Sequence, residues 1–99
     1  MSELVVLKFG ATWCGPCKTM EPNIKKMQEE FPDIKFVSVD TDDDQNLAKE
    51  HKIKSIPAIV LLKDGVEQNR VVGAVLITPL RKAFRDFVSS PKEEENDKE

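Results

Sequence analysis

The stretch Trp13-Cys14-Gly15-Pro16-Cys17 decides the fold, and it contains both cysteines of the chain. It follows an apolar segment, Leu4 to Phe9, and precedes residues with helical spacing. Two thiols so close together at the start of a helix can close a small disulfide. The first thiol can also be held as a reactive thiolate, because the unpaired N–H groups of a helix N-terminus stabilise negative charge and lower a cysteine pKa. The motif therefore predicts a dithiol–disulfide oxidoreductase.

The cysteine pair has two other interpretations. Both thiols could be inert and packed in the interior. They could also form half of a zinc site, but zinc normally takes four ligands, and His51 is the only histidine in the chain. A closed zinc site would require a dimer, so we expect no metal.

Length and composition indicate the setting. The chain has 99 residues, which fits one small domain. No apolar run approaches the roughly 20 residues needed to span a membrane, and the first residues lack the pattern of a signal peptide. We therefore expect a cytoplasmic protein with no membrane partner. Neighbouring cysteines in that compartment are more often catalytic or metal-binding than structural.

Charge is unevenly distributed along the chain. Residues 91–99 hold five acidic and two basic side chains, and the formal net charge of the whole chain is −3. Residues 1–90 are therefore neutral overall, without the positive field that would attract nucleic acid. We predict one domain, residues 1–90, followed by a disordered acidic tail, residues 91–99, which has no apolar side chain to bury.

Hydrophobic patterns predict four strands and three helices. The expected strands are Leu4–Phe9, Ile34–Val39, Ile56–Leu62 and Val66–Val72. One helix follows the cysteine motif, a short one covers Gln45–His51, and a third starts near Thr78-Pro79, a typical N-cap and first helical position. Asp64-Gly65 is a typical turn between antiparallel strands. We expect a mixed α/β sheet in which parallel strands come first and a hairpin last.

This order of elements, together with the cysteine motif, resembles the thioredoxin family. The matching segments are Phe9–Lys18 (FGATWCGPCK), Pro22, Ile56–Ala58, Lys63–Gly65 and Val72–Ala74. The resemblance extends from about residue 4 to residue 89. It implies a thioredoxin-like sheet of about four strands with helices on both faces. It also implies reduction of protein disulfides, with a role in electron transport and cell redox homeostasis.

Three departures from the family pattern are visible. Thioredoxins usually begin with an extra strand and helix, for which this sequence has no residues, so it resembles a minimal version of the fold. A buried aspartate usually lies where this chain has Lys8. A lysine often paired with that aspartate corresponds to Phe36, and Gly10 replaces what is often a bulkier residue.

The resemblance implies roles for the cysteine motif. Cys14, as the exposed thiol, attacks a substrate disulfide, and Cys17, as a buried thiol one helical turn further on, resolves the mixed disulfide. Gly15 and Pro16 modulate the redox potential and favour a reductant. No cofactor is required because the cysteines carry the electrons, and an external reductase like thioredoxin reductase restores the dithiol.

The resemblance also implies a substrate groove beside the cysteines. Pro57 corresponds to the family's cis-proline, and Ile56 and Pro57 offer backbone groups to an extended substrate, a form of strand addition. Gly73 and Ala74 form a wall of small residues, and Trp13 contacts the substrate. The resemblance implies that the substrates are proteins that contain disulfides.

Lys8 has two interpretations. Its stem could pack in the core while the ammonium reaches the surface. The ammonium could instead stabilise a nearby thiolate, which makes the disulfide more oxidising, so we predict a potential above that of an ordinary thioredoxin. Burial would oppose this by favouring a neutral amine, which could act as a base.

Two alternatives to a disulfide reductase stay open. One is a glutaredoxin-like enzyme, or an exchange enzyme of the disulfide-isomerase or oxidase type, suggested by Lys8 and the short start. The other is a redox-independent binding module that uses the same groove. We expect a monomer in each case.

Overall fold

The structure is a computed structural model in which residues 2–89 are described. The predicted tail, residues 91–99, lies outside the described residues. The elements in chain order are β1 (Leu4–Gly10), α1 (Gly15–Glu30), β2 (Lys35–Asp40), α2 (Gln45–Glu50), β3 (Ala58–Lys63), β4 (Val66–Val72) and α3 (Ile77–Ser89). The four strands and three helices predicted from the sequence are thus confirmed within the described part of the chain.

The strands form one mixed sheet in the order β2-β1-β3-β4. Strand β1 pairs in parallel with β2 and antiparallel with β3, and β4 closes the sheet as the hairpin partner of β3. The hairpin turns through Asp64 and Gly65, which both have positive φ, as a two-residue turn of this type requires. The register places Lys8 of β1 beside Ser38 of β2 and Ile59 of β3.

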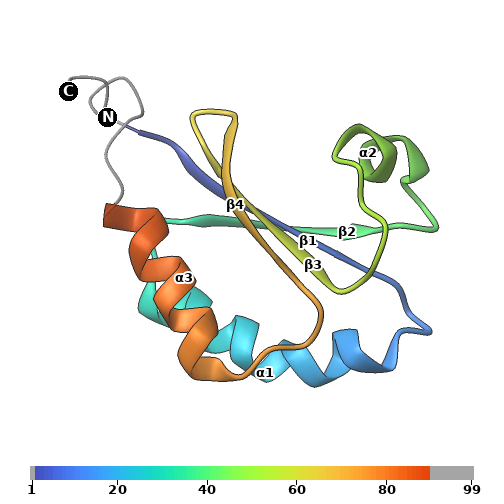
Figure 1. Cartoon of the computed structure of the whole chain (residues 1–99), viewed down its shortest axis with the longest axis horizontal. Coiled ribbons are helices and arrows are strands. Elements are labelled where there is room, and N and C mark those ends of the chain that lie inside the picture. The colour runs from blue at the N-terminus through green and yellow to red at the C-terminus, as the bar shows by residue number, and fades with distance from the viewer. Residues whose placement is uncertain (1, 90–99) are drawn as a thin grey trace.

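Helices cover both faces of the sheet, as predicted (Figure 1). Helices α1 and α3 lie on one face, where the buried side chains are Val6, Met20, Ile24, Met27, Ile34, Ile59, Leu61, Leu80, Phe84 and Phe87. Helix α2 packs on the other face, over Leu7, Phe9, Val39, Ala58 and Val60. A bidentate ion pair between Glu30 and Arg81 also joins α1 to α3. The cysteine motif lies at the start of α1, just after the end of β1.

The sequence placed most element ends within one or two residues. Strand β3 begins at Ala58 rather than Ile56, because Pro57 has no N–H for a ladder hydrogen bond. Helix α3 begins at Ile77, and its Leu80 N–H donates to the Leu76 carbonyl. The predicted N-cap at Thr78 is therefore wrong, since Thr78 lies inside the first turn.

Candidate active site

The two cysteines form a disulfide at the start of α1. Cys14 is the N-cap residue, with extended backbone, and its Sγ accepts a hydrogen bond from the Cys17 N–H at 3.1 Å. Pro16 occupies the first turn, where its missing N–H leaves no intrahelical bond unmade. Sulfur at this position receives both a donor and the positive end of the helix dipole, which stabilise a thiolate after reduction.

The expected exposures of the two cysteines are wrong for this disulfide form. Cys14 is only 3% exposed, whereas Cys17 is half-buried. The Cys14 sulfur is occupied by the disulfide bond and by the Cys17 N–H. The Cys17 sulfur lies next to Gly10, where a Cβ atom would come within 3.2 Å of it. Gly10 therefore packs closely against Cys17, and a larger residue there would crowd the sulfur.

A cavity of about 450 Å³ lies beside these two residues, between the end of the sheet and α1. Its walls include Cys17, but not Cys14. Apolar side chains make up much of the lining: Phe9, Met20, Ile24, Val39, Pro57, Ala58 and Ile59. The polar lining residues are Lys8, Thr12, Lys18, Glu21, Ser38 and Asp40. The cavity lies within the size range of small-molecule sites.

Lys8 is half-buried in this cavity. It has no ion-pair partner among residues 2–89. Its neighbour on β2 is Ser38, whereas Phe36 lies beside Val6. The correspondence of Phe36 to the family's lysine stays a prediction. Lys8 and Ser38 are therefore neighbouring residues in the lining of the cavity.

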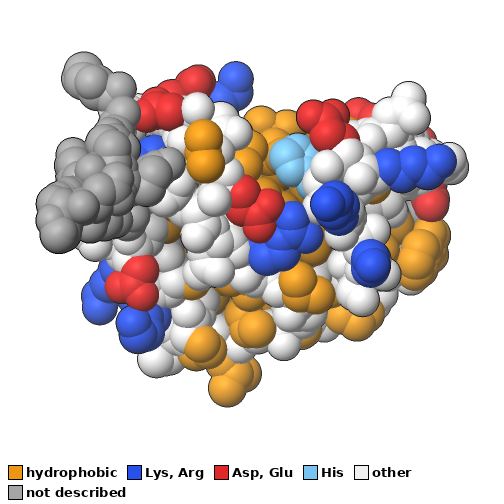
Figure 2. All heavy atoms as spheres, turned by 45° about the horizontal axis from the view of Figure 1, so that its top comes forward, with side chains coloured by type: hydrophobic (Ala, Val, Ile, Leu, Met, Phe, Trp, Pro, Cys, Tyr) orange, Lys and Arg blue, Asp and Glu red, His pale blue; other side chains and the backbone are white. Residues whose placement is uncertain are grey.

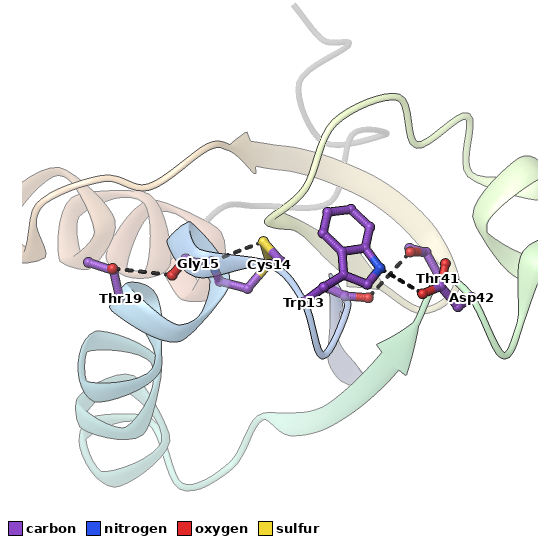
Figure 3. Close-up of a disulfide and its surroundings, with 8 residues drawn as sticks. Trp13, Cys14, Gly15, Thr19, Thr41 and Asp42 are labelled. Carbon is purple, nitrogen blue, oxygen red and sulfur yellow. Dashed lines mark hydrogen bonds between the residues drawn. A yellow bond between two sulfur atoms is a disulfide. The ribbon is translucent and has the colours of Figure 1, made fainter.

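Trp13 is 68% exposed and is held by a hydrogen bond that the sequence analysis did not predict. Its indole Nε1 donates to the Asp42 carboxylate at 2.8 Å (Figure 3). The next residue back, Thr41, donates through its N–H to the Gly10 carbonyl at 2.9 Å. The acidic run after β2 also supplies Asp44, the N-cap residue of α2. Only the fold shows that Asp42 reaches the tryptophan beside the disulfide.

The segments predicted to form a groove do come together. The Ile56–Pro57 peptide bond is cis, as predicted, and the Pro57 carbonyl accepts the Gly73 N–H at 2.8 Å. Pro57 lines the cavity with Cys17, whereas Ile56 lines a smaller pocket with Trp13. Gly73 is therefore tied to the proline that lines the same cavity as Cys17.

One part of the groove prediction needs correction. Pro57 was expected to offer backbone groups to a substrate, but it has no N–H and its carbonyl already bonds Gly73. Neither Ile56 nor Ala74 has a backbone hydrogen bond among the described residues. These two residues keep peptide groups available to an extended chain.

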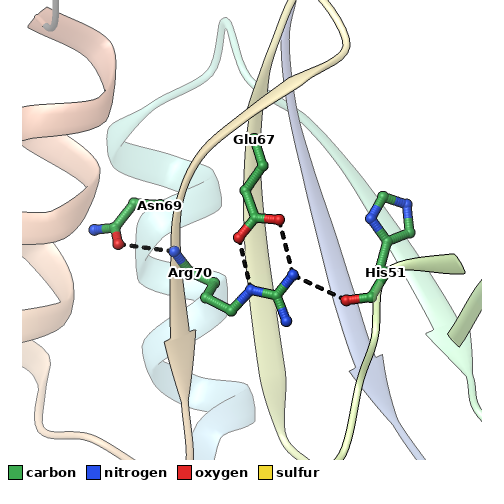
Figure 4. A network of polar contacts seen from close by, with 4 residues as sticks. All are labelled: His51, Glu67, Asn69 and Arg70. Atoms are coloured by element: carbon green, nitrogen blue, oxygen red, sulfur yellow. Dashed lines mark hydrogen bonds and ion pairs between the residues drawn. The ribbon is translucent and has the colours of Figure 1, made fainter. Parts of the chain in front are cut away.

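A polar network joins α2 to β4 (Figure 4). Arg70 makes a bidentate ion pair with Glu67 and donates to the His51 carbonyl at 2.9 Å. The hydrogen bond from Arg70 holds the pKa of Glu67 below its usual range, and the same bond raises the pKa of Arg70. The His51 ring packs on Phe9, and its carbonyl serves the network, so His51 has a structural role here.

Three features of residues 2–89 concern metals, membrane spans and surface charge. No group of three His, Cys, Asp or Glu side chains within residues 2–89 could hold a metal ion. None of the helices in this range is both long and apolar enough to cross a membrane. Acidic and basic side chains are interspersed on the face shown in Figure 2, with no dominant sign.

Comparisons with known proteins agree with this geometry. A family model described as Thioredoxin matches residues 1–86. The chain is 39% identical to a thioredoxin of Mycoplasma genitalium over 82 residues, which cover 83% of this chain and 80% of that protein. It is 42% identical to a thioredoxin H-type of Fagopyrum esculentum over 72 residues, 73% of this chain and 62% of that one.

A solved structure is similar along most of its length. The crystal structure of oxidised mitochondrial thioredoxin 3 from Saccharomyces cerevisiae superposes with a TM-score of 0.79 and 40% identity, over 85% of this chain and 78% of that one. Among curated relatives from plants, including rice and Arabidopsis thaliana, the matched part spans between 53% and 66% of the relative's length.

Proposed function

This chain belongs to the thioredoxin family, and on that premise we propose that it reduces disulfides of protein substrates. The observation that supports this most directly is the Cys14–Cys17 disulfide at the N-cap of α1, with the Cys17 N–H on the Cys14 sulfur. After reduction, the same N–H and the helix dipole favour the Cys14 thiolate. A thiolate is the form that attacks disulfides.

Reduction of a substrate proceeds in two exchanges. The Cys14 thiolate attacks one sulfur of the substrate disulfide, and the other substrate sulfur leaves as a thiolate. The Cys17 thiol then loses its proton and attacks the Cys14 sulfur of the mixed disulfide. This step releases the second substrate thiolate and restores the Cys14–Cys17 disulfide, so two electrons pass to the substrate.

The groove supports an extended peptide as the substrate. The free peptide groups of Ile56 and Ala74 can pair with such a chain as an added strand. Trp13 offers an exposed aromatic surface beside the disulfide, fixed in place by Asp42. Pro57 and Gly73 then act by shaping the groove, because their mutual hydrogen bond ties its two sides together.

Several further parts of the proposal concern the cellular setting. The protein acts as a cytoplasmic monomer, needs no bound cofactor, and receives electrons from an external dithiol reductase.

Gly15 and Pro16 modulate the redox potential of the Cys14–Cys17 pair. Lys8, in the cavity with Cys17, raises the potential by stabilising the reduced, ionised pair, which would bring the protein closer to exchange enzymes.

The proposal is tested by turnover and by the midpoint potential. With dithiothreitol as the electron source, we expect the protein to accelerate reduction of insulin disulfides. The potential of the pair is followed through the fluorescence of Trp13, the single tryptophan. A value near roughly −270 mV indicates a reductant, and a value of about −200 mV or above indicates exchange or oxidation. Absence of insulin turnover by the reduced protein would contradict the proposal.

A further inference from the structure

The cavity beside the disulfide has a volume of about 450 Å³, which the proposed reduction of protein substrates does not use. It has Cys17 in its wall, whereas the groove residues Trp13 and Ile56 line a different pocket. Gly10 and Cys17 both line the cavity, and a side chain at Gly10 would crowd the Cys17 sulfur. A protein segment large enough to fill the groove does not need this space. A small molecule could occupy it and touch a sulfur of the disulfide.

Lys8 is a half-buried cation in the lining of the cavity. Asp40 also lines the cavity as an anion, and one oxygen of its carboxylate accepts the N–H groups of Asp42 and Asp43, at 2.8 and 3.3 Å. Lys18 and Glu21 are exposed residues of opposite charge. Lys8 is half-buried and has no ion-pair partner among the described residues. A ligand with one negative charge would complement Lys8.

The chemistry of the disulfide also favours attack from this side. Thiol–disulfide exchange is faster when the leaving sulfur is the better stabilised thiolate. Attack on Cys17 releases Cys14, whose sulfur accepts the Cys17 N–H at the helix N-cap. Attack on Cys14 releases Cys17, for which no such donor is found among the described residues. The burial of Cys14, which is only 3% exposed, also favours attack on Cys17.

We propose that the cavity admits a low-molecular-weight thiol that carries a carboxylate, and that its sulfur attacks Cys17. The carboxylate lies against Lys8. A bond forms between the ligand sulfur and the Cys17 sulfur, the Cys14–Cys17 bond breaks, and its electron pair leaves with Cys14 as a thiolate. A second thiolate of the same kind attacks the ligand sulfur, so that Cys17 leaves as a thiolate and a small disulfide is released. The inference rests on the proposed dithiol–disulfide function and adds a second, small-molecule electron source.

The test uses small thiols of similar size and different charge. These are 3-mercaptopropionate, 2-mercaptoethanol and cysteamine, which carry a negative, no and a positive charge apart from the thiol. The rate of reduction of the Cys14–Cys17 disulfide is measured for each at equal thiolate concentration. Each rate is divided by the rate of the same thiol with 2,2′-dithiodipyridine, a neutral disulfide, which removes differences in intrinsic reactivity.

We expect the normalised rate to be highest for 3-mercaptopropionate, by roughly fivefold over 2-mercaptoethanol. This preference opposes the formal net charge of the chain, which is −3. In Lys8→Gln the preference disappears. In Lys25→Gln it persists, because Lys25 is exposed on α1 and does not line the cavity. Equal normalised rates for the three thiols in the unsubstituted protein would overturn the inference.

The position of attack is measured separately. Early samples of the unsubstituted protein are quenched with acid and alkylated, and the tandem mass spectrum of the peptide that contains both cysteines locates the bound thiol. We expect it on Cys17, with the alkyl group on Cys14. A thiol found on Cys14 would overturn the inference even if the charge preference holds. Insulin reduction with dithiothreitol distinguishes the two proposals, because it tests the pair without the charged ligand.

Discussion

The two sulfurs of one disulfide lie in different surroundings. On the groove side, Cys14 caps α1, accepts the Cys17 N–H, and has the exposed Trp13 next to it. On the cavity side, Cys17 faces Gly10 and a cavity that contains Lys8. The groove side follows the family pattern closely, whereas the cavity side holds two of the chain's departures from it. Recognition of protein substrates and tuning of the pair can therefore vary separately.

The largest expected effect comes from removing either sulfur. Both Cys14→Ser and Cys17→Ser should lower insulin turnover on the order of 10³-fold or more, because neither variant can complete the cycle. The two differ in what they leave behind. Cys17→Ser retains the stabilised nucleophile, so it should accumulate a mixed disulfide with a substrate, seen as a covalent complex without reductant. Accumulation by Cys14→Ser instead would reverse the assigned roles.

The next largest effect is expected from filling the cavity side. In Gly10→Val the new Cβ would lie about 3.2 Å from the Cys17 sulfur, closer than most side-chain contacts. We expect the free energy of unfolding of the oxidised protein to fall by about 1–3 kcal/mol in urea. Gly15→Ala is the matched control, since a Cβ at Gly15 meets nothing within 4 Å. Equal stability of both variants would show that the space beside Cys17 is not needed.

A smaller effect is expected from the charge on the cavity side. Lys8→Gln removes the positive charge that favours the ionised dithiol, so the midpoint potential should become more negative by roughly 20 mV. Lys25→Gln makes the same change in net charge outside the cavity and should leave the potential unchanged. If both variants shift the potential equally, the charge of Lys8 has no specific effect on the Cys17 side of the disulfide.

The smallest effect is expected at the Glu67–Arg70 pair, which touches neither sulfur. Arg70 lowers the pKa of Glu67, so this pair stabilises the fold fully above the ordinary glutamate pKa and loses its contribution as the pH falls through the lowered pKa. Both side chains are partly exposed, so Glu67→Gln should lower stability by no more than about 1 kcal/mol at neutral pH. The difference should vanish in acid, measured by urea unfolding at several pH values, while the redox potential stays constant.

The elements of the fold were predictable because their signals are local. Asp64 and Gly65 adopt positive φ in a turn whose type their residue types favour. The helical spacing of Met20, Ile24 and Met27 does place all three in the core. Errors occurred at element ends, as for α3, where Thr78 fitted the pattern of an N-cap but lies inside the helix.

The site was predictable where the motif is contiguous and uncertain where strands must be aligned. The cysteine motif indicated both the disulfide and the helix start. The neighbour of Lys8 on β2 is Ser38, and only the register between β1 and β2 decides this. Asp42 reaches Trp13 across a loop, and no local pattern pairs an aspartate with a tryptophan so far away in the chain.

The sequence by itself determined the family, the order of elements and the reactive pair, because these depend on residue types at short spacing. Only the tertiary structure decided which sulfur borders open space. That outcome depends on Gly10, Cys17 and Lys8, which β1 and α1 bring around one cavity. Exposure and charge at a sulfur are set by every segment packed around it, and therefore by contacts that the spacing of a motif does not contain.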